Sequence, residues 1–114
     1  MAGVVERVGP RVVRFIGELD ASNVGDVDAL LEEELLGEGD FTVDLSELTF
    51  VDSMGVGLLA TASEKLADRG NLILLSPDHS VRRVLELVQL HRRPNVKIID
   101  SDSGAGGDER RAAP

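Results

Sequence analysis

The chain has 114 residues and a formal net charge of −9, with no cysteine, tryptophan or tyrosine and only three phenylalanines. This composition predicts one domain with an aliphatic core, excludes disulfides and thiolate metal sites, and argues against a nucleic-acid binder. Because no segment resembles a signal peptide or has the ~20 apolar residues of a membrane span, we expect a cytoplasmic protein that does not enter membranes.

The first two predicted strands form a hairpin. Residues 4–8 and 11–17 are rich in valine and flank the turn residues Gly9 and Pro10, a pattern typical of an antiparallel pair.

A helix follows the hairpin. Residues 18–23 break the second strand and offer Ser22 or Asn23 as an N-cap. Gly37 suits the left-handed position that ends a helix. The apolar residues between these points recur at helical spacing, and we expect them to face the core (Val24, Val27, Leu30, Leu31 and Leu35).

Residues 41–45 predict a buried third strand, and residues 46–51 predict a connection with apolar anchors. The next helix is expected from about Met54 to Asp68, with Ser53 as its N-cap in the simplest interpretation. Its expected inward face combines small and aliphatic residues (Val56, Leu59, Ala60, Ser63, Leu66 and Ala67).

Two glycines, Gly55 and Gly57, fall in the first turn of this helix. A glycine inside a helix costs about 1 kcal/mol relative to alanine. The pair therefore indicates that something approaches the backbone closely, either a neighbouring helix of the protein or an outside partner.

Residues 72–75 are continuously apolar, which favours a central strand covered on both faces. Ser76 and Pro77 indicate the start of a third helix, and residues 96–99 form the last predicted strand. The third helix is expected to bury its apolar residues (Val81, Val84, Leu85 and Val88).

The order β-β-α-β-α-β-α-β predicts an α/β fold. We expect a single domain over residues 1–100, in which the hairpin is followed by alternating helices and strands in a mixed, mostly parallel sheet with the helices packed on it. Residues 101–114 have no apolar periodicity and are expected to form a disordered tail.

In such sheets, partners and ligands meet the loops where strands end and helices begin, here residues 18–23, 46–53 and 76–78. His79 and His91 are interpreted as surface residues, and Asp44 and Asp52 do not imply a shared carboxylate site. No metal-hydrolase, P-loop or nucleophile-elbow motif occurs. We therefore expect a protein that is not an enzyme and has neither a cofactor nor a metal site.

The charges are separated along the chain. Residues 18–52 contain twelve acidic residues and no lysine or arginine, whereas residues 82–97 contain five basic residues and one acid, Glu86. Such runs usually form solvated faces. The alternative is an acidic surface that steers the chain toward a basic partner, with an association rate that falls as salt rises.

Three segments, residues 17–22, 43–46 and 51–59, resemble in order and spacing the signature segments of STAS domains, and residues 81–87 are similar to the helix that follows the fourth strand of that family. They are most similar to the free-standing bacterial anti-sigma factor antagonists. The resemblance implies a protein that binds an anti-sigma factor, usually a serine kinase of the histidine-kinase-like ATPase fold, and so releases a sigma factor. In this family the kinase phosphorylates a hydroxyl in an Asp-Ser-Ser/Thr-Gly loop, which abolishes binding, and a serine phosphatase restores it.

The resemblance implies Ser53 as the phosphorylated hydroxyl and matches Asp20 to an aspartate near the contact surface. The residues expected to bind the partner come from two loops (Asp20, Ser22, Asp52, Ser53, Met54, Gly55, Val56 and Gly57). Met54 departs from the family pattern, because it stands directly before the glycine, where sporulation-type members carry the acceptor hydroxyl.

Two alternatives stay open. One is a STAS scaffold or interaction module that is not switched by phosphorylation, in a stress-signalling complex or a transporter regulator. The other is a response-regulator receiver, which the opening hairpin and the lack of an acidic pair after the first strand disfavour.

Overall fold

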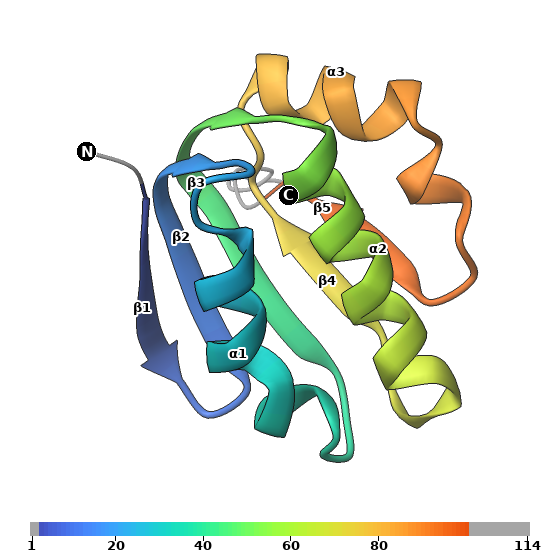
Figure 1. Ribbon diagram of the computed structural model, residues 1–114. Coiled ribbons are helices and arrows are strands. Elements are labelled where there is room, and N and C mark those ends of the chain that lie inside the picture. The colour runs from blue at the N-terminus through green and yellow to red at the C-terminus, as the bar shows by residue number, and fades with distance from the viewer. Residues whose placement is uncertain (1–2, 101–114) are drawn as a thin grey trace, which may run out of the picture.

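The computed structural model describes residues 3–100, so the expected tail at 101–114 lies outside the described residues. It shows a five-stranded sheet with the strands in sequence order, β1-β2-β3-β4-β5 (Figure 1). The first pair is antiparallel and the other three pairs are parallel, which confirms the predicted hairpin and the α/β class. The elements are β1 Val4–Gly9, β2 Val12–Leu19, α1 Val24–Leu35, β3 Phe41–Val51, α2 Ser53–Leu66, η1 Ala67–Arg69, β4 Leu72–Leu75, α3 His79–Leu87, η2 Leu90–Arg92 and β5 Val96–Ile99.

One face of the sheet forms the core. Figure 1 shows α1 and α2 lying over this face, as right-handed crossovers between parallel strands in sequence order require. The strand side chains beneath the helices are buried (Val13, Phe15, Phe41, Val43, Leu45, Leu72, Leu74 and Val96). Within residues 3–100, no helix is both long enough and apolar enough to cross a membrane.

Within residues 3–100, the side chains on the opposite face of the sheet stay at least partly exposed, and we call it the open face. Arg14 of β2 bonds Asp44 of β3 there, with Nε 3.0 Å from Oδ2, and Ile73 and Leu75 of β4 are only half-buried. β4 lies between β3 and β5, as expected of an interior strand, but the prediction that both of its faces are covered is wrong, because Ile73 and Leu75 stay partly exposed. A continuous apolar segment such as residues 72–75 can therefore also form a strand with one buried face and one half-buried face.

The third strand is longer than the sequence pattern indicated. Residues 46–51, expected as a connection, continue β3 to Val51, and β2 likewise continues to Leu19. Pairing between these two strands shifts register twice, and β3 buries every third residue at Leu45, Leu48 and Val51. A search for strict alternation misses such a segment, because bulges break the period of two.

The ends of the helices also differ from expectation. Gly39, not Gly37, takes the positive φ, at 97°. The last carbonyls of α1 are bonded by arginines instead: Arg69 Nη2 donates to Leu35 O at 2.8 Å, and Arg11 Nη1 donates to Glu34 O. Arg11 and Arg69 are distant from the end of α1 in the sequence, so the position of a nearby glycine could not predict these hydrogen bonds.

Three residues predicted to face the core are exposed, namely Leu30, Ala67 and Val88. Leu30 lies beside the buried residues of α1, whereas Ala67 and Val88 follow the last residues of α2 and α3 and no longer continue the helical face. The third helix was expected to start at Ser76 and Pro77 with Ser76 as its N-cap, but the N-cap is Asp78, which accepts a hydrogen bond from Val81 N at 2.9 Å.

The Asp78 cap makes stability depend on pH. The hydrogen bond from Val81 N is the main cause that lowers the pKa of Asp78, and Ser80 adds to it, whereas burial acts in the opposite direction. The pKa of an aspartate in an unfolded chain is about 4. The stabilisation is therefore complete above that pH and is lost as pH falls through the lower pKa of the folded chain.

Asp78→Asn tests this dependence, because asparagine is also a good N-cap but does not titrate. Thermal unfolding of the parent and the variant is measured between about pH 6 and pH 2.5. We expect the variant to lose less stability than the parent as pH falls. Equal losses in the two proteins would contradict the role given to this carboxylate.

Candidate functional site

Two loops meet at the carboxyl end of the parallel strands. The first follows β2 and carries Asp20 and Ser22, and the second joins β3 to α2 at Asp52. Asp52 N donates a hydrogen bond to Leu19 O at 3.2 Å, so the ends of the two strands lie side by side. The structure thus brings together the two segments that the sequence analysis assigned to a partner.

Asp52 connects these loops through its carboxylate. Oδ1 accepts hydrogen bonds from Met54 N at 2.9 Å and from Gly55 N at 3.0 Å, which makes Asp52 the N-cap of α2. Oδ2 accepts a hydrogen bond from Ala21 N in the other loop at 3.2 Å. The prediction that Ser53 caps this helix is therefore wrong, and the capping aspartate also holds the first loop in place.

The first loop is fixed by its own side chains. Asp20 Oδ1 accepts hydrogen bonds from Ser22 N at 3.0 Å and from Ser22 Oγ at 2.6 Å. Asn23 Oδ1 accepts from Asp20 N at 3.0 Å, and Asn23 Nδ2 donates to Glu18 O at 2.8 Å. The Ser22 hydroxyl is thus engaged within the loop, whereas both Asp20 and Ser22 remain accessible at its surface.

Ser53 and Met54 are the first two residues of α2, and both are exposed. Within residues 3–100, the Ser53 hydroxyl has no hydrogen-bond partner, because Asp52 performs the capping. Met54 is 53% exposed, and Phe50, near the end of β3, is 49% exposed. Phe50 was not among the residues expected to bind the partner, although an aromatic side chain two residues before the Asp-Ser pair was an available signal.

The two glycines of α2 have different surroundings. A Cβ at Gly55 would lie 2.5 Å from Leu19 O and 2.6 Å from Val51 Cγ2, so Gly55 allows α2 to lie against the strands of its own sheet. Val56 is buried in the core. A Cβ at Gly57 would meet nothing within 4 Å, so this residue is accessible from outside. We call the accessible residues of the two loops and of the start of α2 the tip, which consists of Asp20, Ser22, Asp52, Ser53, Met54 and Gly57.

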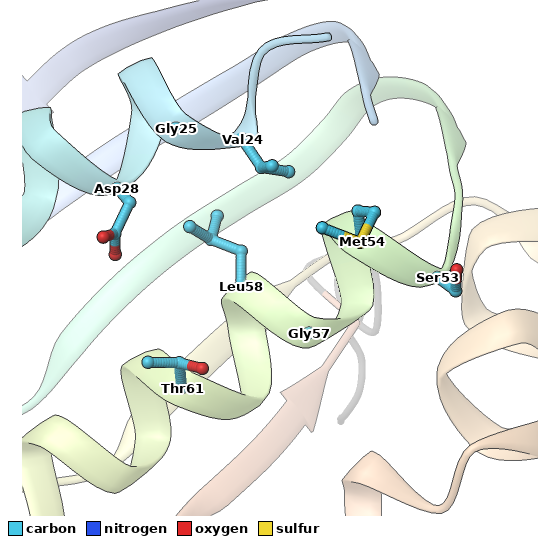
Figure 2. A pocket seen from close by; sticks show the side chains of 8 residues that line it. All are labelled: Val24, Gly25, Asp28, Ser53, Met54, Gly57, Leu58 and Thr61. Atoms are coloured by element: carbon cyan, nitrogen blue, oxygen red, sulfur yellow. The ribbon is translucent and has the colours of Figure 1, made fainter. Parts of the chain in front are cut away.

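A groove between α1 and α2 continues from the tip. Its volume is about 380 Å³, and Figure 2 shows Met54 and Leu58 of α2 directed toward Val24 of α1. Asp28 of α1 stands farther along the groove. The lining residues are Val24, Gly25, Asp28, Ser53, Met54, Gly57, Leu58 and Thr61. The sequence did not predict this groove, because it depends on how two helices are placed side by side.

The other candidate carboxylate, Asp44, has a separate structural role. Burial alone would raise its pKa, but hydrogen bonds from Ser46 and Arg14, together with the charge of Arg14, hold the pKa below its usual range. Its partners lie on the open face of the sheet. Among the described residues, no group of three or more histidine, cysteine, aspartate or glutamate residues could hold a metal ion.

The fold and the tip together define a small α/β domain with an exposed helix start at the carboxyl end of its sheet. The chain belongs to the STAS domain family, whose model matches residues 2–102. A comparison with curated protein sequences gave no match.

Solved structures with the same fold include three informative examples. The anti-sigma factor antagonist SpoIIAA in its unphosphorylated form is 26% identical, with a TM-score of 0.63 over 88% of this chain and 89% of that one. The protein TM1081 is 28% identical, with a TM-score of 0.67 over 87% of this chain and 82% of that one. An anti-sigma factor antagonist from Mycobacterium paratuberculosis is 22% identical over 84% of each chain, and its TM-score of 0.70 shows a shared fold.

Proposed function

We propose that this protein is an anti-sigma factor antagonist that binds an anti-sigma factor through the tip and thereby releases a sigma factor. The observation that carries the proposal is the exposed Ser53 hydroxyl, which has no hydrogen-bond partner in the described part of the chain and stands at a helix start held by Asp52. Family membership and the likeness to SpoIIAA support it. The protein acts by binding and is not itself an enzyme, and its place of action is the cytoplasm.

Reversible phosphorylation of Ser53 switches the binding off. The partner is a serine kinase of the histidine-kinase-like ATPase fold, which transfers the γ-phosphoryl group of ATP to Ser53 Oγ. ADP leaves, and the hydroxyl proton passes to a base of the kinase. The phosphate adds about two negative charges beside the Asp52 carboxylate. Since it lies at the positive end of the α2 dipole, the domain stays folded while the contact surface changes, and a serine phosphatase reverses the step.

The kinase and ATP test this proposal with mass spectrometry as the readout. Phosphate is expected on Ser53 in the parent chain and in Ser80→Ala, and no phosphate is expected in Ser53→Ala. Ser80 is the matched control, because its hydroxyl is also exposed in the first turn of a helix but lies outside the tip and is bonded to Asp78. Binding of the kinase is expected to weaken at least about 100-fold after phosphorylation, since a bulky dianion then occupies the contact surface. Phosphate on another residue, or binding that phosphate leaves unchanged, would contradict the switch.

Met54 favours a second candidate function. It occupies the position of the second hydroxyl in the family motif and is 53% exposed, so it offers an apolar contact that phosphorylation does not alter. In that case the chain is an unphosphorylated STAS scaffold or interaction module within a stress-signalling complex. Stable binding of the partner in the presence of ATP, with Ser53 unmodified, is the result that distinguishes this candidate.

A further inference from the structure

The groove between α1 and α2 has the form of a docking site next to the tip. Its floor is apolar and consists of Val24, Met54 and Leu58 (Figure 2). Gly25 on one helix and Gly57 on the other leave its walls open, because a Cβ at either position would meet nothing within 4 Å. A volume of about 380 Å³ is large enough for side chains of another molecule.

Charge defines what the groove can accept. Asp28 is the acidic residue that lines it, and α1 carries further acids but no lysine or arginine. Lys65 Nζ lies 3.4 Å from Asp28 Oδ1, but the two side chains are 30% and 44% exposed. Exposed ion pairs of this kind contribute little to stability. Asp28 can therefore exchange Lys65 for a cation of a partner with only a small loss of free energy.

The backbone around the groove favours one mode of binding. The groove is lined by residues of two helices and by the first residues of α2, so it presents no strand edge to which an extended peptide could add. An amphipathic helix that places its apolar face in a hydrophobic groove fits this arrangement. A basic residue one turn from the apolar anchor would then reach Asp28.

We propose that the α1–α2 groove binds an amphipathic helix of the partner that presents an apolar anchor followed one turn later by arginine or lysine. This inference rests on the proposed function, since the partner is the anti-sigma kinase. The tip and the groove form one continuous surface because Ser53, Met54 and Gly57 belong to both. The groove supplies recognition, and the Ser53 hydroxyl supplies the switch.

The experiment measures the affinity of the purified anti-sigma kinase for the parent chain and for four variants by calorimetric titration. Gly57→Leu fills the groove, and Asp28→Asn removes its charge. Ala29→Leu and Glu32→Gln are the matched controls, because both residues are exposed on α1 and do not line the groove. Circular dichroism melts confirm that all five chains are folded.

We expect Gly57→Leu to weaken binding at least about 10-fold and Asp28→Asn about 5-fold, whereas both controls stay within about 2-fold. If the parent binds but all four variants bind equally well, the groove inference is overturned and the proposed function stands. If the parent does not bind the kinase, both fail. If groove amides shift with protein concentration in NMR spectra recorded without the kinase, the occupant is a second copy of this chain and the inference is also overturned.

Discussion

Gly55→Ala is expected to lower the free energy of unfolding by about 1–3 kcal/mol, the usual cost of overpacking a close contact. The added Cβ would lie 2.5 Å from Leu19 O and 2.6 Å from Val51 Cγ2. The first atom belongs to the backbone of β2 and also accepts the hydrogen bond from Asp52 N, so it cannot move without disturbing the joint between the two loops. Relief of the clash therefore requires α2 to shift away from the sheet.

Gly57→Ala is the matched control, because it makes the same chemical change two residues along the same helix. Its Cβ meets nothing within 4 Å, and replacing a helical glycine by alanine stabilises by up to about 1 kcal/mol. Urea unfolding of the parent and the two variants gives both values. A change of the same sign in the two variants would show that close packing at Gly55 does not determine the result.

The sequence predicted the fold class and the order of the elements, because these depend on local signals. The turn at Pro10 separates two valine-rich strands, and the apolar spacing from Val24 to Leu35 corresponds to α1. The alternation of helices with strands after the hairpin then implied parallel pairing and right-handed crossovers. The structure confirms these parts of the prediction.

Features that depend on contacts between distant residues were not predicted. The continuation of β3 to Val51 requires irregular pairing with β2, and the end of α1 is held by Arg11 and Arg69. The sequence pattern also could not decide which residue of the Asp-Ser pair caps α2, because both types are good N-caps. The bonds from Met54 N and Gly55 N to Oδ1 show that Asp52 is the cap, and its second carboxylate oxygen accepts from Ala21 N, 31 positions away.

That hydrogen bond gives Asp52 a positioning role at the tip, and the expected loss in Asp52→Ala has two components. Removal of the cap leaves Met54 N and Gly55 N without their acceptor, which costs about 1–2 kcal/mol of stability. Loss of the acceptor for Ala21 N also removes the side-chain bond that joins the loop of Asp20 and Ser22 to the start of α2. We therefore expect the affinity for the anti-sigma kinase to fall at least about 10-fold, since the two parts of the contact surface are no longer fixed relative to each other by this bond.

Asp78→Ala separates these two components, because Asp78 caps α3 with the same kind of bond and its carboxylate accepts hydrogen bonds from Ser80 and Val81 within its own helix start. Both variants are expected to lose similar stability in urea, but Asp78→Ala should bind the kinase within about 2-fold of the parent. Asp52→Asn refines the comparison, since Oδ1 still caps α2 while an amide group placed at the Oδ2 position cannot accept from Ala21 N. If Asp52→Asn binds as tightly as the parent, the bond between the two loops does not position the tip. If it binds as weakly as Asp52→Ala, the contribution of Asp52 to binding comes from that bond and not from the helix cap.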